Sequence, residues 1–244
     1  MTAINTMNLV KKYGDKTAVK GLNLAIEEGE LFALLGVNGA GKTTTIKMLS
    51  CLTKPTSGDA VLLNDSIVEN PHAIKEKINV SPQETAVAPK LTVRENLEFI
   101  AGVYGSDKVI ARQKANQIIT TLGLSEVEKQ KAKTLSGGWQ RRLSIAMALI
   151  SEPKILFMDE PTLGLDVLAR RELWSVIKGL KGKIVIILTT HYLEEAEALA
   201  DRIGIMTAGE LKAVGTAVEL ISLSGEKNFE DAFVKLATQQ EVIA

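Results

Sequence analysis

Cysteine is almost absent from this 244-residue sequence, which contains it once, at Cys51. A single cysteine cannot form an intrachain disulfide bond or supply a thiolate cluster for a structural metal. Cys51 falls in an apolar stretch with helical spacing, so we expect an ordinary core thiol. The fold must therefore depend on a hydrophobic core, which a chain of this length is long enough to form.

Long hydrophobic runs are also absent. No apolar run approaches the roughly 18 residues that a membrane-spanning helix needs, and the opening segment MTAINTMNLVKKYG lacks the apolar block of a secretory signal. We therefore expect a cytoplasmic protein. Any association with a membrane would be peripheral, on the cytoplasmic face and through a partner.

The sequence also lacks an excess of charge of either sign. The sequence has 29 basic and 29 acidic side chains, so its formal net charge is zero. Neutrality gives no general reason to expect nucleic acid or an anionic membrane surface as a partner. We expect no nucleic-acid partner, and basic residues that bind anions must be placed individually.

Short apolar segments alternate with helical segments along most of the chain. Residues 4–10 and 17–26 have the pattern of two antiparallel strands joined by a turn. Continuous apolar runs, typical of buried strands, occupy residues 31–35, 155–158 and 184–188. This pattern predicts an α/β core with a mostly parallel sheet and an N-terminal antiparallel β-subdomain.

A strand-poor stretch at about residues 92–151 predicts an α-helical subdomain inserted into this core. Thr92 and Glu95 have the spacing of a capping box at the start of a helix. Ser125 and Glu128 repeat that spacing and predict a second box.

The C-terminal part predicts a hairpin around Gly209 and then a helix that opens at Thr216, with Glu219 three residues on. A short helical tail is expected over about residues 225–244. We assign residues 1–244 to a single domain, because no low-complexity linker separates the segments.

Residues 36–43 read GVNGAGKT, a match to the Gly-x4-Gly-Lys-Thr phosphate loop. The loop follows an apolar strand and precedes a helix, whose N-terminus and backbone N–H groups can bind phosphate oxygens. It predicts a P-loop NTPase core that binds ATP and Mg²⁺. The expected nucleotide-binding residues are Gly36, Asn38, Gly39, Ala40, Gly41, Lys42, Thr43 and Thr44.

Two residues of this loop have expected roles in the chemistry. Lys42 would act in catalysis by neutralising charge on the β- and γ-phosphates, and Thr43 would offer its hydroxyl to Mg²⁺. The loop alone leaves kinases, GTPases, helicases and transport ATPases open.

Polar residues follow two of the apolar runs, at the edge of the sheet where ligands bind. Asp159 closes the run ILFMD and is suited to holding Mg²⁺, while Glu160 is the expected catalytic base for an attacking water. His191 ends another run and could bond the γ-phosphate as a third catalytic residue. The three side chains should meet near the phosphate loop.

A second anion-binding element begins at residues 135–138, which read LSGG and open a helix. Ser136 is a good N-cap residue, and the glycines leave the first backbone N–H groups bare. Two phosphate-binding elements of one chain can share one ATP only if they come from different subunits. A two-fold dimer with two ATP molecules between identical surfaces satisfies both elements.

The ordered set of motifs resembles the nucleotide-binding domain of ABC transporters over nearly the full chain. The set consists of GVNGAGKT, SPQE, LSGG, ILFMDE, PTLGLD and the histidine of THYLEEAEALADRIGIMTAGEL. The last stretch resembles the branch that exports drugs, sodium and lipids. The resemblance implies an ATPase that works with polytopic membrane permease subunits and with a second copy of itself or a paralogous ATPase.

The resemblance also implies roles for five further residues. Tyr13 would stack on adenine, and Gln83 would sense Mg²⁺ or water and connect to the membrane partner. Ser136 and Gly138 would contact the γ-phosphate of the ATP held by the opposite subunit. Asp166 would connect the two sites across the dimer.

One position departs from the family pattern, because Trp139 stands where the signature normally has Gln. We expect Trp139 to pack at the start of the helix, while the contacts of Ser136 and Gly138 remain.

Two other classes of protein stay open at this point. A soluble ABC ATPase of translation or DNA repair typically carries two nucleotide domains or a long coiled-coil insertion, and the sequence shows neither. A GTPase or small-molecule kinase would leave LSGG, Gln83 and His191 unexplained, and no Asn-Lys-x-Asp motif is present.

Overall fold

A six-stranded sheet with strand order β10-β9-β3-β8-β7-β6 forms the centre of the structure, a computed structural model that describes residues 1–238. Strands β6, β7, β8, β3 and β9 run parallel, and β10 is antiparallel to β9. Their bounds are β3 Leu31–Leu35, β6 Ile78–Ser81, β7 Ile155–Asp159, β8 Val185–Thr190, β9 Arg202–Thr207 and β10 Glu210–Gly215. The predicted mostly parallel sheet is confirmed.

A second, antiparallel sheet is built mainly from the N-terminal part of the chain. Its order is β2-β1-β4-β5, with bounds β1 Thr2–Tyr13, β2 Lys16–Glu27, β4 Ser57–Leu62 and β5 Asp65–Ser66. Buried and exposed residues alternate along much of β2, as expected for a sheet with one face on the core. The predicted N-terminal antiparallel subdomain is confirmed, with both strands longer than the sequence pattern indicated.

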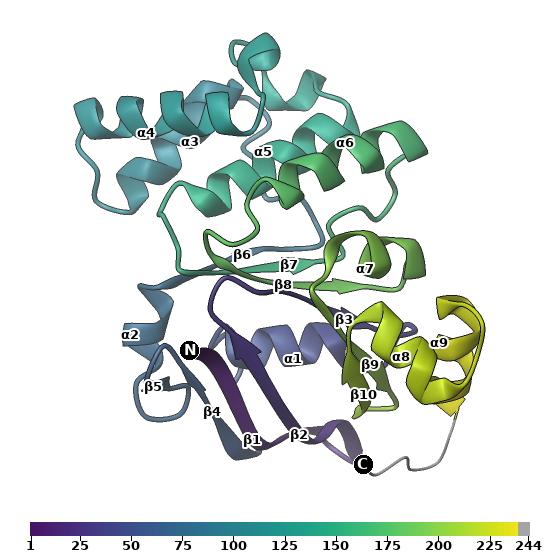
Figure 1. Ribbon diagram of the computed structural model, residues 1–244. Helices are drawn as coiled ribbons and strands as arrows, with labels where there is room; N and C mark the ends of the chain where they lie inside the picture. The colour runs from purple at the N-terminus through teal and green to yellow at the C-terminus, as the bar shows by residue number, and fades with distance from the viewer. Residues whose placement is uncertain (239–244) are drawn as a thin grey trace.

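Helices cover both faces of the central sheet. Figure 1 shows α3, α4, α5 and α6 stacked above it, and α1 below it, next to the antiparallel sheet. The helix bounds are α1 Lys42–Leu49, α2 Pro71–Lys75, α3 Val93–Val103, α4 Lys108–Thr121, α5 Gly137–Leu149, α6 Val167–Lys178, α7 Leu193–Leu199, α8 Ala217–Ser224 and α9 Phe229–Thr238.

Strand β3 separates the two hydrophobic cores that this layering creates. Leu31, Ala33 and Leu35 pack with the core under the helical layer, whereas Phe32 and Leu34 pack with the core beside α1. All five side chains are buried because successive residues of a strand point to opposite faces, and both faces are covered. The β3 run therefore has to be apolar throughout.

The stretch over residues 92–151 holds α3, α4 and α5, and its described elements include no strand longer than a single bridge. The capping box of Thr92 and Glu95 is confirmed, with both reciprocal bonds present. The second box is wrong, because Ser125 belongs to a three-residue 3-10 turn that makes no side-chain cap bond. The carboxylate of Glu128 instead lies 2.7 Å from the guanidinium of Arg94.

The hairpin of β9 and β10 and the capping box of Thr216 and Glu219 at α8 are confirmed. Of the tail predicted over about residues 225–244, α9 covers Phe229–Thr238, and residues 239–244 lie outside the described residues. Within residues 1–238, none of the helices combines the length and apolar character that a membrane span requires.

Cys51 is partly buried against the core beside α1, where burial raises the pKa of its thiol. It lies in the turn after α1, not in a helix, with a φ of 56°. The predicted packing role holds, although the thiol is not fully enclosed.

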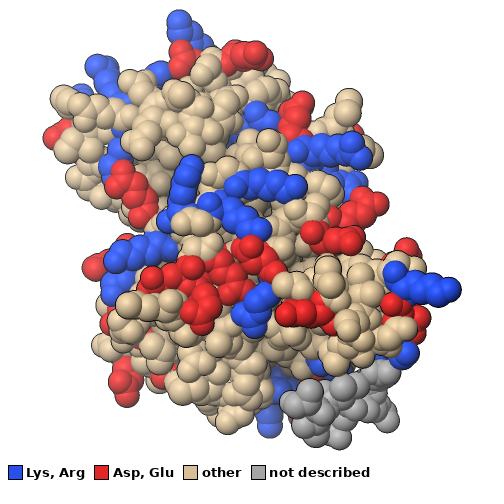
Figure 2. Space-filling model, in the orientation of Figure 1, with Lys and Arg blue, Asp and Glu red and all other residues tan. Residues whose placement is uncertain are grey.

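Figure 2 shows a group of acidic side chains near the middle of the face drawn, directly below a band of basic side chains, with smaller groups of both signs elsewhere. This mixture agrees with the zero formal charge of the sequence. No single-sign field of the kind that attracts nucleic acid dominates the face drawn.

Candidate functional site

The phosphate loop connects the end of β3 to the start of α1, and two of its glycines are required by close approach. Gly41, the N-cap of α1, has a φ of 107°, and a Cβ there would lie 2.5 Å from the carbonyl oxygen of Ala18. A Cβ at Gly36 would lie 2.2 Å from the carbonyl oxygen of Met206. These distances leave no room for a side chain, so the loop can hold this shape only with glycine.

Lys42, the first residue of α1, brings a cation into the loop. Its Nζ donates to the carbonyl oxygens of Gly36, at 2.7 Å, and Val37, at 3.2 Å. Burial lowers the pKa of Lys42, and the carboxylates of Glu160 and Asp159 partly offset that shift. The ammonium is therefore held by the turn of the loop, where it can balance the charge of a bound phosphate.

Thr43 and Asp159 meet as predicted for a magnesium site. The hydroxyl of Thr43 donates to Oδ1 of Asp159 at 3.1 Å, and the hydroxyl of Thr189 donates to the same oxygen. Among residues 1–238 no group of three His, Cys, Asp or Glu side chains could hold a metal on its own. Hydroxyl and carboxylate oxygens fit Mg²⁺, which usually completes its shell with water and substrate phosphates.

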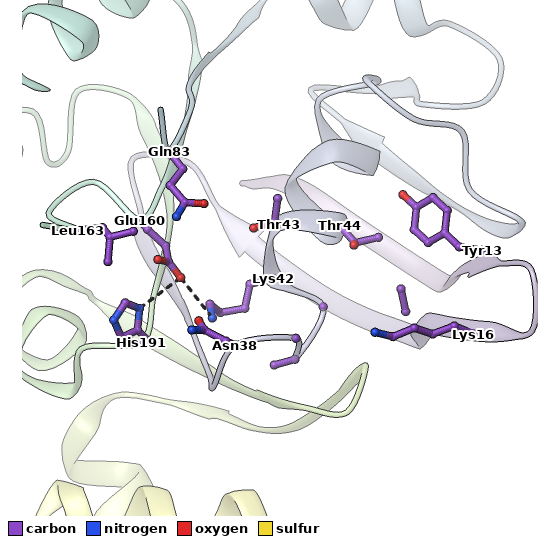
Figure 3. A pocket seen from close by; sticks show the side chains of 14 residues that line it. Tyr13, Lys16, Asn38, Lys42, Thr43, Thr44, Gln83, Glu160, Leu163 and His191 are labelled. Atoms are coloured by element: carbon purple, nitrogen blue, oxygen red, sulfur yellow. Dashed lines mark ion pairs between the residues drawn. The ribbon is translucent and has the colours of Figure 1, made fainter. Parts of the chain in front are cut away.

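Glu160 lies directly after β7, with its carboxylate between Lys42 and His191 (Figure 3). Its Oε1 is 3.7 Å from Nζ of Lys42 and 3.3 Å from Nδ1 of His191. The backbone φ is 46°, in the left-handed region, and the backbone N–H donates to Thr189. A strained acidic residue at the end of a strand, aimed at the phosphate loop, suits a general base.

A cavity of about 490 Å³ joins these residues at the carboxyl ends of the parallel strands. Figure 3 shows Tyr13 and Gln83 on different sides of it, with Lys42 between them. Tyr13 ends β1, and Gln83 follows β6. Predicted residues that line the cavity are Tyr13, Asn38, Gly39, Ala40, Gly41, Lys42, Thr43, Thr44, Gln83, Glu160 and His191.

Two predicted residues do not line the cavity but accept a hydrogen bond from a residue that does. Gly36 accepts from Lys42, and Asp159 accepts from Thr43. The ring of Tyr13 is half exposed, and Nζ of Lys11 lies 5.0 Å from its centroid. An exposed aromatic face at the rim of a phosphate-binding cavity is available to stack on a base.

Besides Gly36 and Asp159, three further predicted residues do not line the cavity: Ser136, Gly138 and Asp166. Ser136 is the N-cap of α5, but its side chain makes no cap bond, so the hydroxyl is free for another partner. Asp166 is the N-cap of α6 and accepts bonds from the N–H groups of Leu168 and Ala169. That these three residues serve the opposite subunit's ATP stays a prediction.

Lys16, Ala18 and Leu163 also line the cavity, although the sequence motifs did not predict them. Lys16 opens β2 just after the turn that follows Tyr13, and that proximity was the available signal. Ala18 and Leu163 are apolar residues without any chemical signature, so only the folded structure could find them.

Trp139 packs partly buried against the core under the helical layer, as expected for this departure from the family pattern. The guanidinium of Arg142 lies 4.5 Å from the centroid of its ring and 3.1 Å from Glu172.

A family model described as ABC transporter matches residues 19–163. The linearmycin resistance ATP-binding protein LnrL of Bacillus subtilis is 43% identical over 219 residues, which are 89% of this chain and 70% of that protein. The daunorubicin/doxorubicin resistance ATP-binding protein DrrA of Streptomyces peucetius is 40% identical over 224 residues, which are 91% of this chain and 68% of that protein.

Solved structures show the same similarity. CbiO1 from Clostridium perfringens, part of the ABC transporter complex cbiONQ, has a TM-score of 0.84 and 27% identity, with 91% of each chain covered. The ATP-binding cassette MJ0796, in a dimeric post-hydrolysis state bound to ADP and Pi, has a TM-score of 0.77 and 28% identity. The matched region covers 87% of this chain and 98% of the MJ0796 chain.

Proposed function

The chain belongs to the ABC transporter family as an ATP-binding, ATP-hydrolysing subunit, and from this premise we propose how its residues perform that task. Two chains bind two ATP molecules head to tail, each ATP held with Mg²⁺ by the phosphate loop of one chain. The subunit powers export of a drug or lipid through separate membrane subunits. The resistance proteins named above support a drug as the cargo.

The observation that carries the proposal is the division of the predicted site residues into two groups. One group converges on the cavity around Lys42 and Glu160, and the other, with Ser136 and Gly138, lies outside it. Contact of the second group with a γ-phosphate therefore requires a second chain. The dimeric state of the cassette MJ0796 supports this arrangement.

The proposed reaction is attack of water on the γ-phosphate, with Glu160 accepting the proton. Lys42 balances phosphate charge, and His191 holds the attacking water or the γ-phosphate in line. Mg²⁺, held beside Thr43 and Asp159, would supply neutralisation of charge on the phosphate oxygens. Product release then separates the two chains and resets the membrane partner.

A groove of about 230 Å³ beside Gln83 supports the proposed connection to a membrane subunit. It is lined by Asn79, Pro82, Ile100, Val103, Tyr104 and other residues of β6, α3 and α5. Val103 and Tyr104 are exposed, although their side chains are largely apolar. Exposed apolar side chains beside a groove are typical of an interaction site.

Affinity purification from detergent-solubilised membranes of the native host tests the transporter proposal. We expect the tagged wild-type chain to retain a polytopic membrane protein in stoichiometric amount, identified by mass spectrometry. Val103→Glu, which adds a charge at an exposed groove position, should lose that protein while keeping ATPase activity. Recovery of ribosomes or nucleic-acid proteins instead would favour the soluble ABC ATPase.

Ser136→Ala is expected to lower the maximal rate of ATP hydrolysis about 10- to 100-fold, the cost of one hydrogen bond to a charged group. ATP affinity of the monomer should stay unchanged, because Ser136 does not line the cavity of its own chain. Steady-state ATPase assays and calorimetric ATP titration measure the two quantities. Ser125→Ala, an exposed serine in a 3-10 turn, is the matched control.

Tyr13→Ala is expected to weaken ATP binding by roughly tenfold, because base–aromatic stacking contributes about 1–3 kcal/mol. Tyr13→Trp retains an aromatic face and should bind like the wild type. Equal affinity of Tyr13→Ala and wild type, measured by titration calorimetry, would refute the stacking role.

A further inference from the structure

We infer that Arg141 is a positioning residue for ATP hydrolysis, which fixes the Glu160 and Gln83 segments to the helix that begins at the LSGG motif. This inference rests on the proposed roles of Glu160 and Gln83. Arg141 lies on α5 and does not line the ATP cavity, so it acts through other residues and not on ATP.

The guanidinium of Arg141 bonds backbone carbonyl oxygens from two segments distant in sequence. Nε donates to Pro161 at 2.8 Å, and one terminal nitrogen donates to Asp159 at 3.0 Å. The other terminal nitrogen donates to Pro82 and to Gln83, the latter at 3.2 Å. Four bonds nearly exhaust the five N–H donors of a guanidinium, whose planar fork is rigid.

The burial of Arg141 makes these bonds decisive. The side chain is 4% exposed, and its four hydrogen-bond partners among residues 1–238 are all backbone carbonyls. Burial lowers the pKa of Arg141 to about 10, and the carboxylates of Asp159 and Glu195 oppose the shift from a distance. A buried cation is costly unless its hydrogen bonds are satisfied, and here backbone carbonyls of site segments satisfy them.

Two of these carbonyls flank Glu160 on either side. Glu160 has a φ of 46°, a conformation that a non-glycine residue keeps only when its surroundings fix it. Arg141 holds the carbonyls of residues 159 and 161, while the N–H of Glu160 donates to Thr189. The direction of the Glu160 carboxylate therefore depends on the guanidinium.

The same helix links this clamp to the predicted contact with the opposite subunit. Ser136 is the N-cap of α5, and Arg141 follows Gly137 by four residues, about 6 Å along the helix axis. A shift of the LSGG end of α5 would move the guanidinium and, with it, the segments of Gln83 and Glu160. The structure thus assigns to Arg141 the connection between the LSGG end of α5 and the segments of Gln83 and Glu160.

The test compares Arg141→Gln and Arg141→Lys with wild type in kcat and in ATP dissociation constant. Arg141→Gln should lower kcat about 10- to 100-fold, since misplacing a catalytic group by about 1 Å has an effect of this size. Its ATP dissociation constant should stay within about threefold, because the phosphate loop is untouched. Arg141→Lys, which keeps the charge but loses the fork, should recover part of kcat. Arg112→Gln, an exposed arginine on α4, is the matched control.

Two outcomes would overturn the inference: kcat of Arg141→Gln within twofold of wild type, or loss of ATP affinity by the same factor as kcat. If Arg141→Gln fails to fold, the same two outcomes measured for Arg141→Lys would overturn the inference. Glu160→Gln is measured in parallel. An inactive Glu160→Gln beside a fully active Arg141→Gln contradicts only this inference, whereas an active Glu160→Gln contradicts the proposed function.

Discussion

Glu160→Gln is expected to lower kcat for ATP hydrolysis by about 10²- to 10⁴-fold, the range that a positioned general base contributes. The amide cannot accept a proton, but it is isosteric and can remain beside Lys42 and His191. ATP binding should therefore persist. The variant should accumulate as an ATP-bound dimer, visible by size-exclusion chromatography with ATP and absent without it.

Glu126→Gln provides the matched control, because Glu126 is exposed in a 3-10 turn and forms no ion pair among the described residues. It should hydrolyse ATP at the wild-type rate and show no trapped dimer. Normal hydrolysis by Glu160→Gln would refute the assignment of Glu160 as the base. A variant that is inactive but stays monomeric with ATP would refute the proposed order of dimerisation before hydrolysis.

Lys42→Ala is expected to abolish measurable hydrolysis and to weaken ATP binding by about 10- to 100-fold or more, since hydrogen bonds to charged groups contribute about 1.5–3 kcal/mol each. Lys42 is buried in the loop, 5% exposed, and no other lysine or arginine except Lys16 lines the cavity among the described residues. Titration calorimetry with ATP and a steady-state ATPase assay measure both effects.

Lys47→Ala is the control for charge and helix composition, because Lys47 lies on the same helix with its side chain exposed. It should bind and hydrolyse ATP like the wild type. The melting temperature of each variant without nucleotide separates loss of binding from loss of folding. ATP affinity of Lys42→Ala equal to that of wild type would contradict the role of Lys42 in binding phosphate.

Most of the fold followed from local patterns in the sequence. Continuous apolar runs predicted β3, β7 and β8 because strands covered on both faces are mostly apolar, with polar residues of β7 and β8 only at their carboxyl ends. The capping spacing predicted the start of α3 correctly, but the same spacing failed at Ser125. There, Arg94 binds Glu128 from a different segment, and a local pattern carries no information about that partner.

The site was predictable to the extent that its chemistry lies in contiguous motifs. Lys42, Thr43, Asp159 and Glu160 stand in short segments whose residue types have few other uses in this order. Lys16, Ala18 and Leu163 were missed because their place at the cavity depends on how β2 and the segment after β7 pack around the loop.

The sequence by itself determined the family and the parallel sheet, and it located the residues that we propose bind ATP, because each depends on periodicity or on motifs within a few residues. Only the tertiary structure decided that Thr189 bonds Asp159 and that Arg141 holds the carbonyls on both sides of Glu160. These contacts join residues separated by 18 to 59 positions, counting the bond from Arg141 to Pro82. Backbone carbonyls are the same in every residue, so no sequence pattern marks which of them a buried guanidinium will bind.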